Sequence, residues 1–428
     1  MADVTVRRVF LPLVVAAIVV SGFPGLSAVE GSRTVHAEDW PQFRGPGGQG
    51  HSTERGLPVE WSETRNIVWK TRIQGLGWSS PVVAGGRVWI TTAVKDRSGS
   101  LRALAFDVET GREVVNTEVF RVGNVDAPNP KNSLASPTPI VDGDRVYVHF
   151  GSDGTAALTT AGEIVWKTRL QYESMHGNGG SPIVYQDLLI FSCDGPDTAF
   201  VVALDKATGK VRWKTARRRP FDQAYTTPLV IRVGDADQIV SVGAYRAAAY
   251  EPLTGKEIWR VSYPVRFPEG FSNVLRPVYG HGLVFISGGF NEPSFLAVRA
   301  DGKGDVTSTH VAWTLTRGAP LTPSPLLVGD ELYLVNDTGV AMCLDAKTGQ
   351  PYWQARIGLG FSASPVFADG RIYFQSEDGV TTALAPGKVF QKIATNELDG
   401  AMLSSMAISG GSIFIRTNHD LYRIGDRK

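Results

Sequence analysis

Short apolar runs alternate with turn residues along most of the chain. A typical unit begins with a proline and a brief apolar run, as in Pro81-Val-Val83, where a missing backbone N–H is tolerated because it is the first position of a strand. A Gly- or Asp-containing turn follows, and then a segment of alternating apolar and polar positions, such as Arg371-Ile-Tyr-Phe-Gln375. Because period-two alternation after such a turn is typical of a β-hairpin, the pattern predicts strands.

The unit repeats eight times. Its third strand ends, in the clearest copies, in the motif Asp-x-x-Thr-Gly-x-x-x-Trp, as at residues 205–213 and 345–353. We expect the glycine to supply a positive φ and the tryptophan to fill the gap between neighbouring sheets, with Phe390 in that place in the seventh unit. The opening residues of the units are Pro81, Pro137, Pro182, Pro228, Pro277, Pro325, Pro365 and, in the eighth, Met406. Eight such repeats predict an all-β fold, an eight-bladed β-propeller of four-stranded blades.

The last unit has only three strand-like segments, within residues 405–424. The segment Asn66-Ile-Val-Trp69, near the start of the chain, resembles a fourth strand that has no unit of its own. We therefore expect this N-terminal strand to complete the last blade, with Trp69 beside residues 421–424. Such a closure leaves no free sheet edge in the ring.

Residues 1–37 are predicted to be a signal peptide, cleaved after residue 28 or residue 37. Arg7 and Arg8 precede an apolar run from Val9 to Val20, and helix-breaking glycines and a proline follow. An uncleaved anchor is the alternative. Residues 38–65 are rich in Gly and Pro but contain three large aromatic residues, so they are expected to form an irregular N-terminal arm packed on the propeller, which spans residues 66–428.

Composition narrows the possible partners. Removing residues 1–37 takes away three arginines and two acids, which lowers the formal charge from +1 to 0, so charge gives no reason to expect nucleic acid. The basic run Arg217-Arg218-Arg219 is interpreted as a solvated surface loop. Cys193 and Cys343 lie far apart in strand-like runs and are expected to be separate buried thiols. We expect a monomer without a membrane span in the mature chain.

The Asp-x-x-Thr-Gly-x-x-x-Trp copies resemble the pyrroloquinoline-quinone (PQQ) type repeats of eight-bladed propellers, over roughly residues 66–424. That superfamily includes quinoprotein alcohol dehydrogenases and the outer-membrane protein assembly factor BamB. The opening Asp39-Trp-Pro-Gln-Phe-Arg-Gly is similar to that of secreted propellers of planctomycete-type bacteria. The BamB resemblance implies a non-catalytic periplasmic or secreted scaffold that binds a protein or peptide partner.

The resemblance also implies an alternative, an oxidoreductase that uses PQQ and calcium. Quinoprotein dehydrogenases of this type carry two adjacent cysteines near the quinone, and this chain has no adjacent cysteines. No spacing in the sequence marks a calcium or other metal site, and we predict no catalytic residue and no cofactor. A third hypothesis is a site for a sugar or another small polar molecule.

In a propeller, the segment that joins one blade to the next reaches inward, so residues just before each Ser-Pro are expected to line one mouth of the central channel. Aromatic, amide and imidazole groups gather there, which is a chemistry suited to a small polar ligand or a peptide. The predicted ligand- or partner-binding residues are Trp78, Asn132, His176, Asn178, Arg276 and Phe361.

Overall fold

The computed structural model describes residues 38–97, 99–126, 129–217, 223–263, 272–288 and 293–426. The predicted signal peptide and two residues of the predicted basic loop, Arg218 and Arg219, lie outside the described residues. The described residues include two 3₁₀ turns, η1 (Pro46–Gly48) in the arm and η2 (Gly151–Asp153) in a loop between two strands. No helix in this described part is long and apolar enough to cross a membrane.

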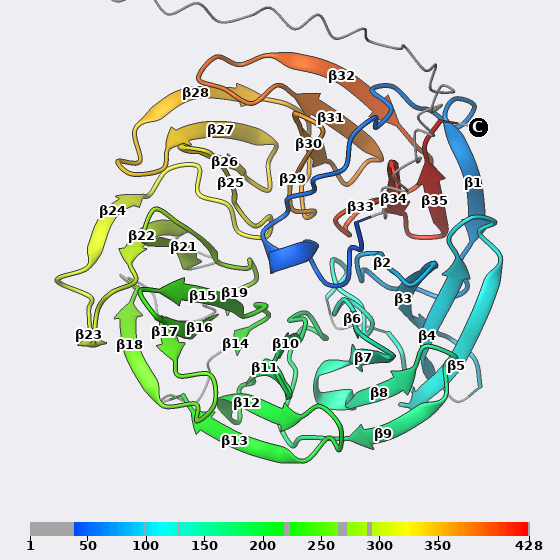
Figure 1. Cartoon of the computed structure of the whole chain (residues 1–428), viewed down its shortest axis with the longest axis horizontal. Helices are drawn as coiled ribbons and strands as arrows, with labels where there is room; N and C mark the ends of the chain where they lie inside the picture. The colour runs from blue at the N-terminus through cyan, green and yellow to red at the C-terminus, as the bar shows by residue number, and fades with distance from the viewer. Residues whose placement is uncertain are drawn as a thin grey trace, which may run out of the picture. The chain divides into compact units, whose positions relative to one another are not determined.

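Eight sheets, each with four antiparallel strands as its blade, surround a central axis (Figure 1), which confirms the predicted all-β, eight-bladed propeller. In each blade the strands follow one another from the innermost to the outermost. Blade 1 contains β2 (Val82–Ala84), β3 (Arg87–Val94), β4 (Ser100–Asp107) and β5 (Glu113–Arg121), and blade 2 contains β6 (Ile140–Asp142), β7 (Arg145–His149), β8 (Thr155–Thr159) and β9 (Ile164–Thr168). Blade 3 contains β10 (Ile183–Tyr185), β11 (Leu188–Asp194), β12 (Ala199–Asp205) and β13 (Val211–Ala216), with the short β14 (Gln223–Ala224) and β19 (Ser272–Asn273) added.

The remaining blades follow the same order. Blade 4 contains β15 (Leu229–Val233), β16 (Ala236–Val242), β17 (Arg246–Tyr250) and β18 (Glu257–Ser262), with β23 (Gly304–Asp305) at its edge; blade 5 contains β20 (Val278–Gly280), β21 (Leu283–Gly288), β22 (Ser294–Arg299) and β24 (Val311–Leu315). Blade 6 contains β25 (Leu326–Val328), β26 (Glu331–Val335), β27 (Val340–Asp345) and β28 (Pro351–Arg356), and blade 7 contains β29 (Val366–Ala368), β30 (Arg371–Gln375), β31 (Val380–Leu384) and β32 (Lys392–Glu397). Blade 8 contains β33 (Ala407–Ser409), β34 (Ser412–Arg416), β35 (Asp420–Ile424) and β1 (Ile67–Arg72).

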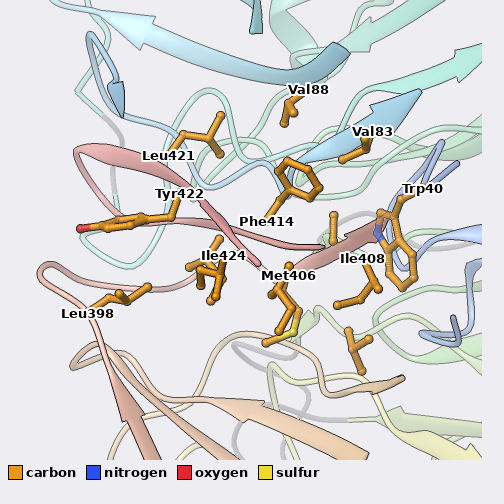
Figure 2. Close-up of a cluster of buried hydrophobic side chains, with 14 of the residues drawn as sticks. Trp40, Val83, Val88, Leu398, Met406, Ile408, Phe414, Leu421, Tyr422 and Ile424 are labelled. Carbon is orange, nitrogen blue, oxygen red and sulfur yellow. The ribbon is translucent and has the colours of Figure 1, made fainter. Parts of the chain in front are cut away.

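The ring is closed by the N-terminal strand. Strand β1 pairs antiparallel with β35, and Trp69 lies opposite Arg423, as predicted. Side chains of blade 8, including Ile408, Phe414 and Ile424, form one buried cluster with Trp40 of the arm and Val83 of blade 1 (Figure 2). The last blade is therefore stabilised by N-terminal segments, the arm and β1, that pack on its C-terminal strands.

The motif tryptophans join neighbouring blades. In blade 3, the Trp213 ring lies on Gly255 of blade 4, and its Nε1 donates a hydrogen bond of 2.9 Å to the carbonyl of Pro252. Gly255 has a φ of +69°, and a side chain at this position would collide with the indole ring. Equivalent bonds to the next blade start from Trp69, Trp166, Trp313 and Trp353. The motif tryptophan of one blade thus packs on the motif glycine of the next blade.

Blade 7 departs from the prediction for Phe390. The residue that takes the tryptophan register is Ala394, opposite Ala383 in β31, whereas Phe390 precedes the strand and contacts Trp353 of blade 6. The arm supplies a tryptophan here: Trp61 is 3% exposed and lies 6.1 Å, centroid to centroid, from Tyr373. The prediction failed because a residue distant in sequence fills the gap.

Arg217 does not belong to a solvated loop. Its side chain is buried and forms an ion pair with the buried carboxylate of Asp194. The Asp194 carboxylate offsets the cost of burying this arginine, and the basic run by itself did not reveal the pair. The two cysteines are confirmed as separate buried thiols.

Candidate functional site at the mouth of the central channel

A ring of hydrogen bonds links the innermost strands where they begin. The backbone N–H just before the opening proline of one blade donates to the hydroxyl of the corresponding Ser or Thr in the next blade, at 2.9 to 3.1 Å. The hydroxyl residues of this ring are Ser80, Thr138, Ser181, Thr227, Ser324, Ser364 and Ser405. The ring is interrupted after Thr227, because the corresponding residue of the next blade is Arg276, which has no hydroxyl to accept the bond.

This ring corrects the register of the second unit. Thr138, and not Ser136, takes part in the ring, and β6 begins directly after Pro139. The opening proline of blade 2 is therefore Pro139 instead of Pro137. Two consecutive Ser/Thr-Pro pairs in the sequence made the two registers indistinguishable by pattern.

The arm closes one end of the channel. Trp40 forms an antiparallel bridge with Val83 of blade 1, the carbonyl of Pro41 accepts a 2.8 Å bond from Val141 of blade 2, and Gly50 and Ser52 bond to Phe367 of blade 7. Gln49 accepts a 2.7 Å bond from the backbone of Tyr279 in blade 5. The arm, with η1, crosses the centre of the ring (Figure 1). The Trp-Pro-Gln-Phe-Arg segment thus has a structural role as a plug.

Above this plug lies a cavity of about 390 Å³. All seven hydroxyl residues of the ring line it, and Phe43 of the arm contributes to its wall. Its other lining residues come mostly from the loops that precede the innermost strands. The cavity therefore lies at the mouth of the channel, where the loops before the innermost strands were expected.

Three of the six predicted residues line this cavity: Trp78, Asn132 and His176. The Asn132 Nδ2 donates a 2.8 Å bond to the carbonyl of His176, and the His176 N–H donates a 3.2 Å bond to the hydroxyl of Tyr225. The ring centroids of His176 and Tyr225 lie 6.1 Å apart. These contacts hold one side of the mouth in place.

The other three predicted residues lie elsewhere. Asn178 is buried behind the mouth, where its Nδ2 bonds to the carbonyl of Leu134 and, at 3.2 Å, to Asp153. Arg276 points to the closed end, where it donates to the carbonyl of Phe43. Phe361 is 1% exposed and packs in the core that blades 6 and 7 share. These residues lie in the loops before the innermost strands, as expected, but their distance in sequence from the Ser-Pro pairs did not show which way their side chains point.

Three further lining residues were absent from the predicted set: Lys131, Tyr225 and Asp337. Burial raises the pKa of Tyr225 to about 12, so its hydroxyl is protonated at neutral pH. Lys131 pairs with Glu377 of the blade 7 loop at 2.8 Å. Tyr225 directly follows the Ala224 end of β14 and could have been chosen from its place before a Thr-Pro; Lys131 and Asp337 carried no distinguishing signal.

The lining does not fit PQQ with calcium. Calcium prefers six to eight oxygen ligands, several of them carboxylates. Asp337 is the one carboxylate among the described lining residues, and its oxygens already accept bonds from the Leu321 N–H at 2.8 Å and the Thr322 hydroxyl at 2.6 Å. In the described ranges, no group of three or more His, Cys, Asp or Glu side chains could hold a metal ion. Lys131 is the one described lysine or arginine of the lining, whereas PQQ is a tricarboxylate.

The sequence matches the family described as outer membrane protein assembly factor BamB over residues 50–171, 105–310 and 246–389. The chain belongs to this family. A stretch of 116 residues is 30% identical to the BamB of Burkholderia pseudomallei (strain K96243) and covers 26% of this chain and 29% of that protein. A stretch of 202 residues is 24% identical to the BamB of Legionella pneumophila (strain Paris) and covers 46% of this chain and 50% of that protein. The chain thus spans half or less of the length of these BamB proteins.

The fold agrees with that of a solved BamB. The crystal structure of BamB from Moraxella catarrhalis matches with a TM-score of 0.60 at 15% identity, and the match covers 84% of this chain and 97% of that one. At this level of identity the likeness to BamB shows the fold alone. The recognition of a BamB-like, PQQ-type repeat propeller is confirmed.

Proposed function

We propose that this protein is a non-catalytic scaffold that binds a segment of a partner protein at the open mouth of its channel. The observation that carries the proposal is a cavity closed on one side by the protein's own arm and lined by hydroxyl, amide and aromatic groups. Such groups suit the backbone and side chains of a peptide, which needs hydrogen-bond partners and an apolar contact. Membership of the BamB family supports this scaffold role.

Exposed apolar side chains around the mouth support a protein partner. Leu76, Met175 and Leu359 are 42%, 46% and 68% exposed. Each lies within three residues of a lining residue: Trp78, His176 and Ser362 respectively. A partner that covers these exposed apolar side chains removes their surface from water, which favours binding.

We place the protein outside the cytoplasm, in the periplasm or secreted. The predicted signal peptide and the family's role at the outer membrane both favour this location. The partner is then a protein of the same compartment.

A selection of peptides from a random displayed library on the immobilised chain tests the proposal. Peptides that bind the wild type should lose about tenfold or more in affinity for Trp78→Ala, because a central aromatic contact is typically a hot spot. Val211→Ala is the matched control, since Val211 is exposed on the outermost strand of blade 3 and should leave affinity unchanged. Equal binding to Trp78→Ala would contradict the proposed site.

A titration with PQQ and calcium, alongside a dye-linked alcohol oxidation assay, tests the oxidoreductase alternative. We expect neither binding heat nor turnover, because the lining lacks the required charges. Tight binding with turnover would replace the scaffold proposal.

A further inference from the structure

Two buried guanidinium groups lie at the closed end of the channel. Arg44 comes from the arm and is 0% exposed, and Arg276 comes from the loop before β20 and is 2% exposed. Arg276 takes the position that carries a hydroxyl in the other seven blades. The Arg276 guanidinium reaches the carbonyl of Phe43, the residue before Arg44, so the two side chains lie near each other where the arm docks onto the ring.

The hydrogen bonds of these arginines are incomplete. The Arg276 Nη1 donates a 2.6 Å bond to the carbonyl of Phe43, and the Arg44 Nη2 donates a 2.9 Å bond to the carbonyl of Gln49. The Nε and Nη1 of Arg44 and the Nε of Arg276 are buried and have no acceptor within the described part of the chain. Buried donors of charged groups are costly to leave unpaired.

Among the described residues, no carboxylate forms an ion pair with Arg44 or Arg276 or shifts the pKa of either group. The buried Arg217 is paired with Asp194, whereas the buried Arg416 has no carboxylate partner among the described residues but donates to Ser79 and Thr91. Burial lowers the pKa of Arg276 to about 9, and burial together with the charge of Arg276 lowers that of Arg44 to about 9. Both groups are still charged at neutral pH, so two like charges share one buried site.

The site is also tightly enclosed. Gly48 has a φ of +69°, and its Cα lies so close to the Arg276 guanidinium that a side chain there would collide with it. Gly50 approaches the Arg44 Nη2 and the carbonyl of Pro365 in the same way. A compensating group must therefore be small.

We propose that Arg44 and Arg276 hold one small monovalent anion, an inorganic halide or a small carboxylate such as formate, which is enclosed when the arm docks onto the ring. The free N–H groups donate to this anion, and its charge offsets the repulsion between the guanidinium groups. The anion is thus part of the plug, and the arm and the ring recognise each other through it.

Urea unfolding of the full chain in different salts tests the proposal. The protein is refolded in sodium gluconate, whose anion is too bulky for the site, and chloride, bromide or formate then replaces gluconate at constant ionic strength. A ligand that binds only the folded state stabilises it in proportion to the logarithm of its concentration, so the urea midpoint should rise with chloride, with formate, or with both. The salt that is effective identifies the source of the anion.

Variants separate this site from general salt effects. Arg276→Gln should abolish the anion dependence of the urea midpoint. Arg416→Gln is the control, because Arg416 is also buried but its Nη1 already donates to Ser79 and Thr91; it should lower stability and keep the anion dependence. Equal anion dependence in Arg276→Gln and wild type would overturn the proposal.

Diffraction from wild-type crystals grown in bromide, and others grown in formate, needs no variant. An anomalous bromide peak, or planar formate density, between Arg44 and Arg276 would support the proposal. Water density alone in both crystals, together with salt-independent unfolding, would show that waters satisfy these donors and would refute the anion site.

Discussion

The open mouth and the closed end of the channel are bounded by the same innermost strands, but different segments of the chain lie around them. At the mouth, loops of the repeat itself surround a cavity lined by hydroxyl, amide and aromatic side chains. At the closed end, a segment from outside the repeat crosses the ring and buries Trp40 and Arg44. The repeat therefore builds the ring, whereas the arm covers one face of the channel.

The largest expected effect is at the closed end. Trp40→Ala should lower the free energy of unfolding by about 3 to 5 kcal/mol, because the side chain is fully buried between the arm and blades 1 and 8. Urea unfolding measures this loss. If the variant unfolds at the wild-type midpoint, the arm is not part of the folded core.

A second comparison uses two loops of nearly identical sequence, Gly-Leu-Gly-Trp78 and Gly-Leu-Gly-Phe361. Phe361→Ala should cost about 3 to 5 kcal/mol, because Phe361 packs between blades 6 and 7. Trp78→Ala should cost about 1 kcal/mol or less, because Trp78 is half-buried and faces the cavity. Thermal melts of both variants make the test. Equal losses would mean that Trp78 is a packing residue and not a binding residue.

His149, buried in blade 2 behind the mouth, should make stability depend on pH. Burial lowers its pKa to about 3, so the folded state requires the neutral ring, and stability is lost as pH falls from about 6.5 towards 3. The expected contribution is about 1.4 kcal/mol for each pH unit below 6.5. His149→Gln should remove this part of the acid sensitivity in urea unfolding at several pH values. An unchanged pH profile would show that protonation of His149 does not lower the free energy of unfolding.

The smallest effect is expected from Lys131→Ala. This change removes the ion pair with Glu377 at the mouth, but the Lys131 side chain is 57% exposed, and such pairs contribute about 0 to 1 kcal/mol. A larger loss in thermal unfolding would indicate that the pair holds the mouth loops together.

The same contrast explains what could be predicted from the sequence. Blade number, strand order and the closure by Trp69 follow from a repeat whose members obey the same local rules. The replacement of a blade 7 tryptophan by Trp61 could not be predicted, since residues more than 300 positions apart make the contact. At the mouth, loop position predicted Trp78, Asn132 and His176 as lining residues. The similar loops around Trp78 and Phe361 nevertheless place Trp78 at the cavity and Phe361 in the core. Side-chain direction depends on neighbouring blades.

Site-specific photo-crosslinking in cells that produce the chain with its native partners tests the central claim most directly. A photoreactive residue is placed at Leu321 in the mouth, at Gly47 in η1 of the plug, or at Val211 on the outer rim. We predict that one defined partner is captured from Leu321, that Trp78→Ala abolishes this capture without lowering the melting temperature by more than a few degrees, and that Gly47 and Val211 do not capture it. Capture of the same partner from Gly47 or Val211 but not from Leu321 would contradict the assignment of the open mouth as the binding face.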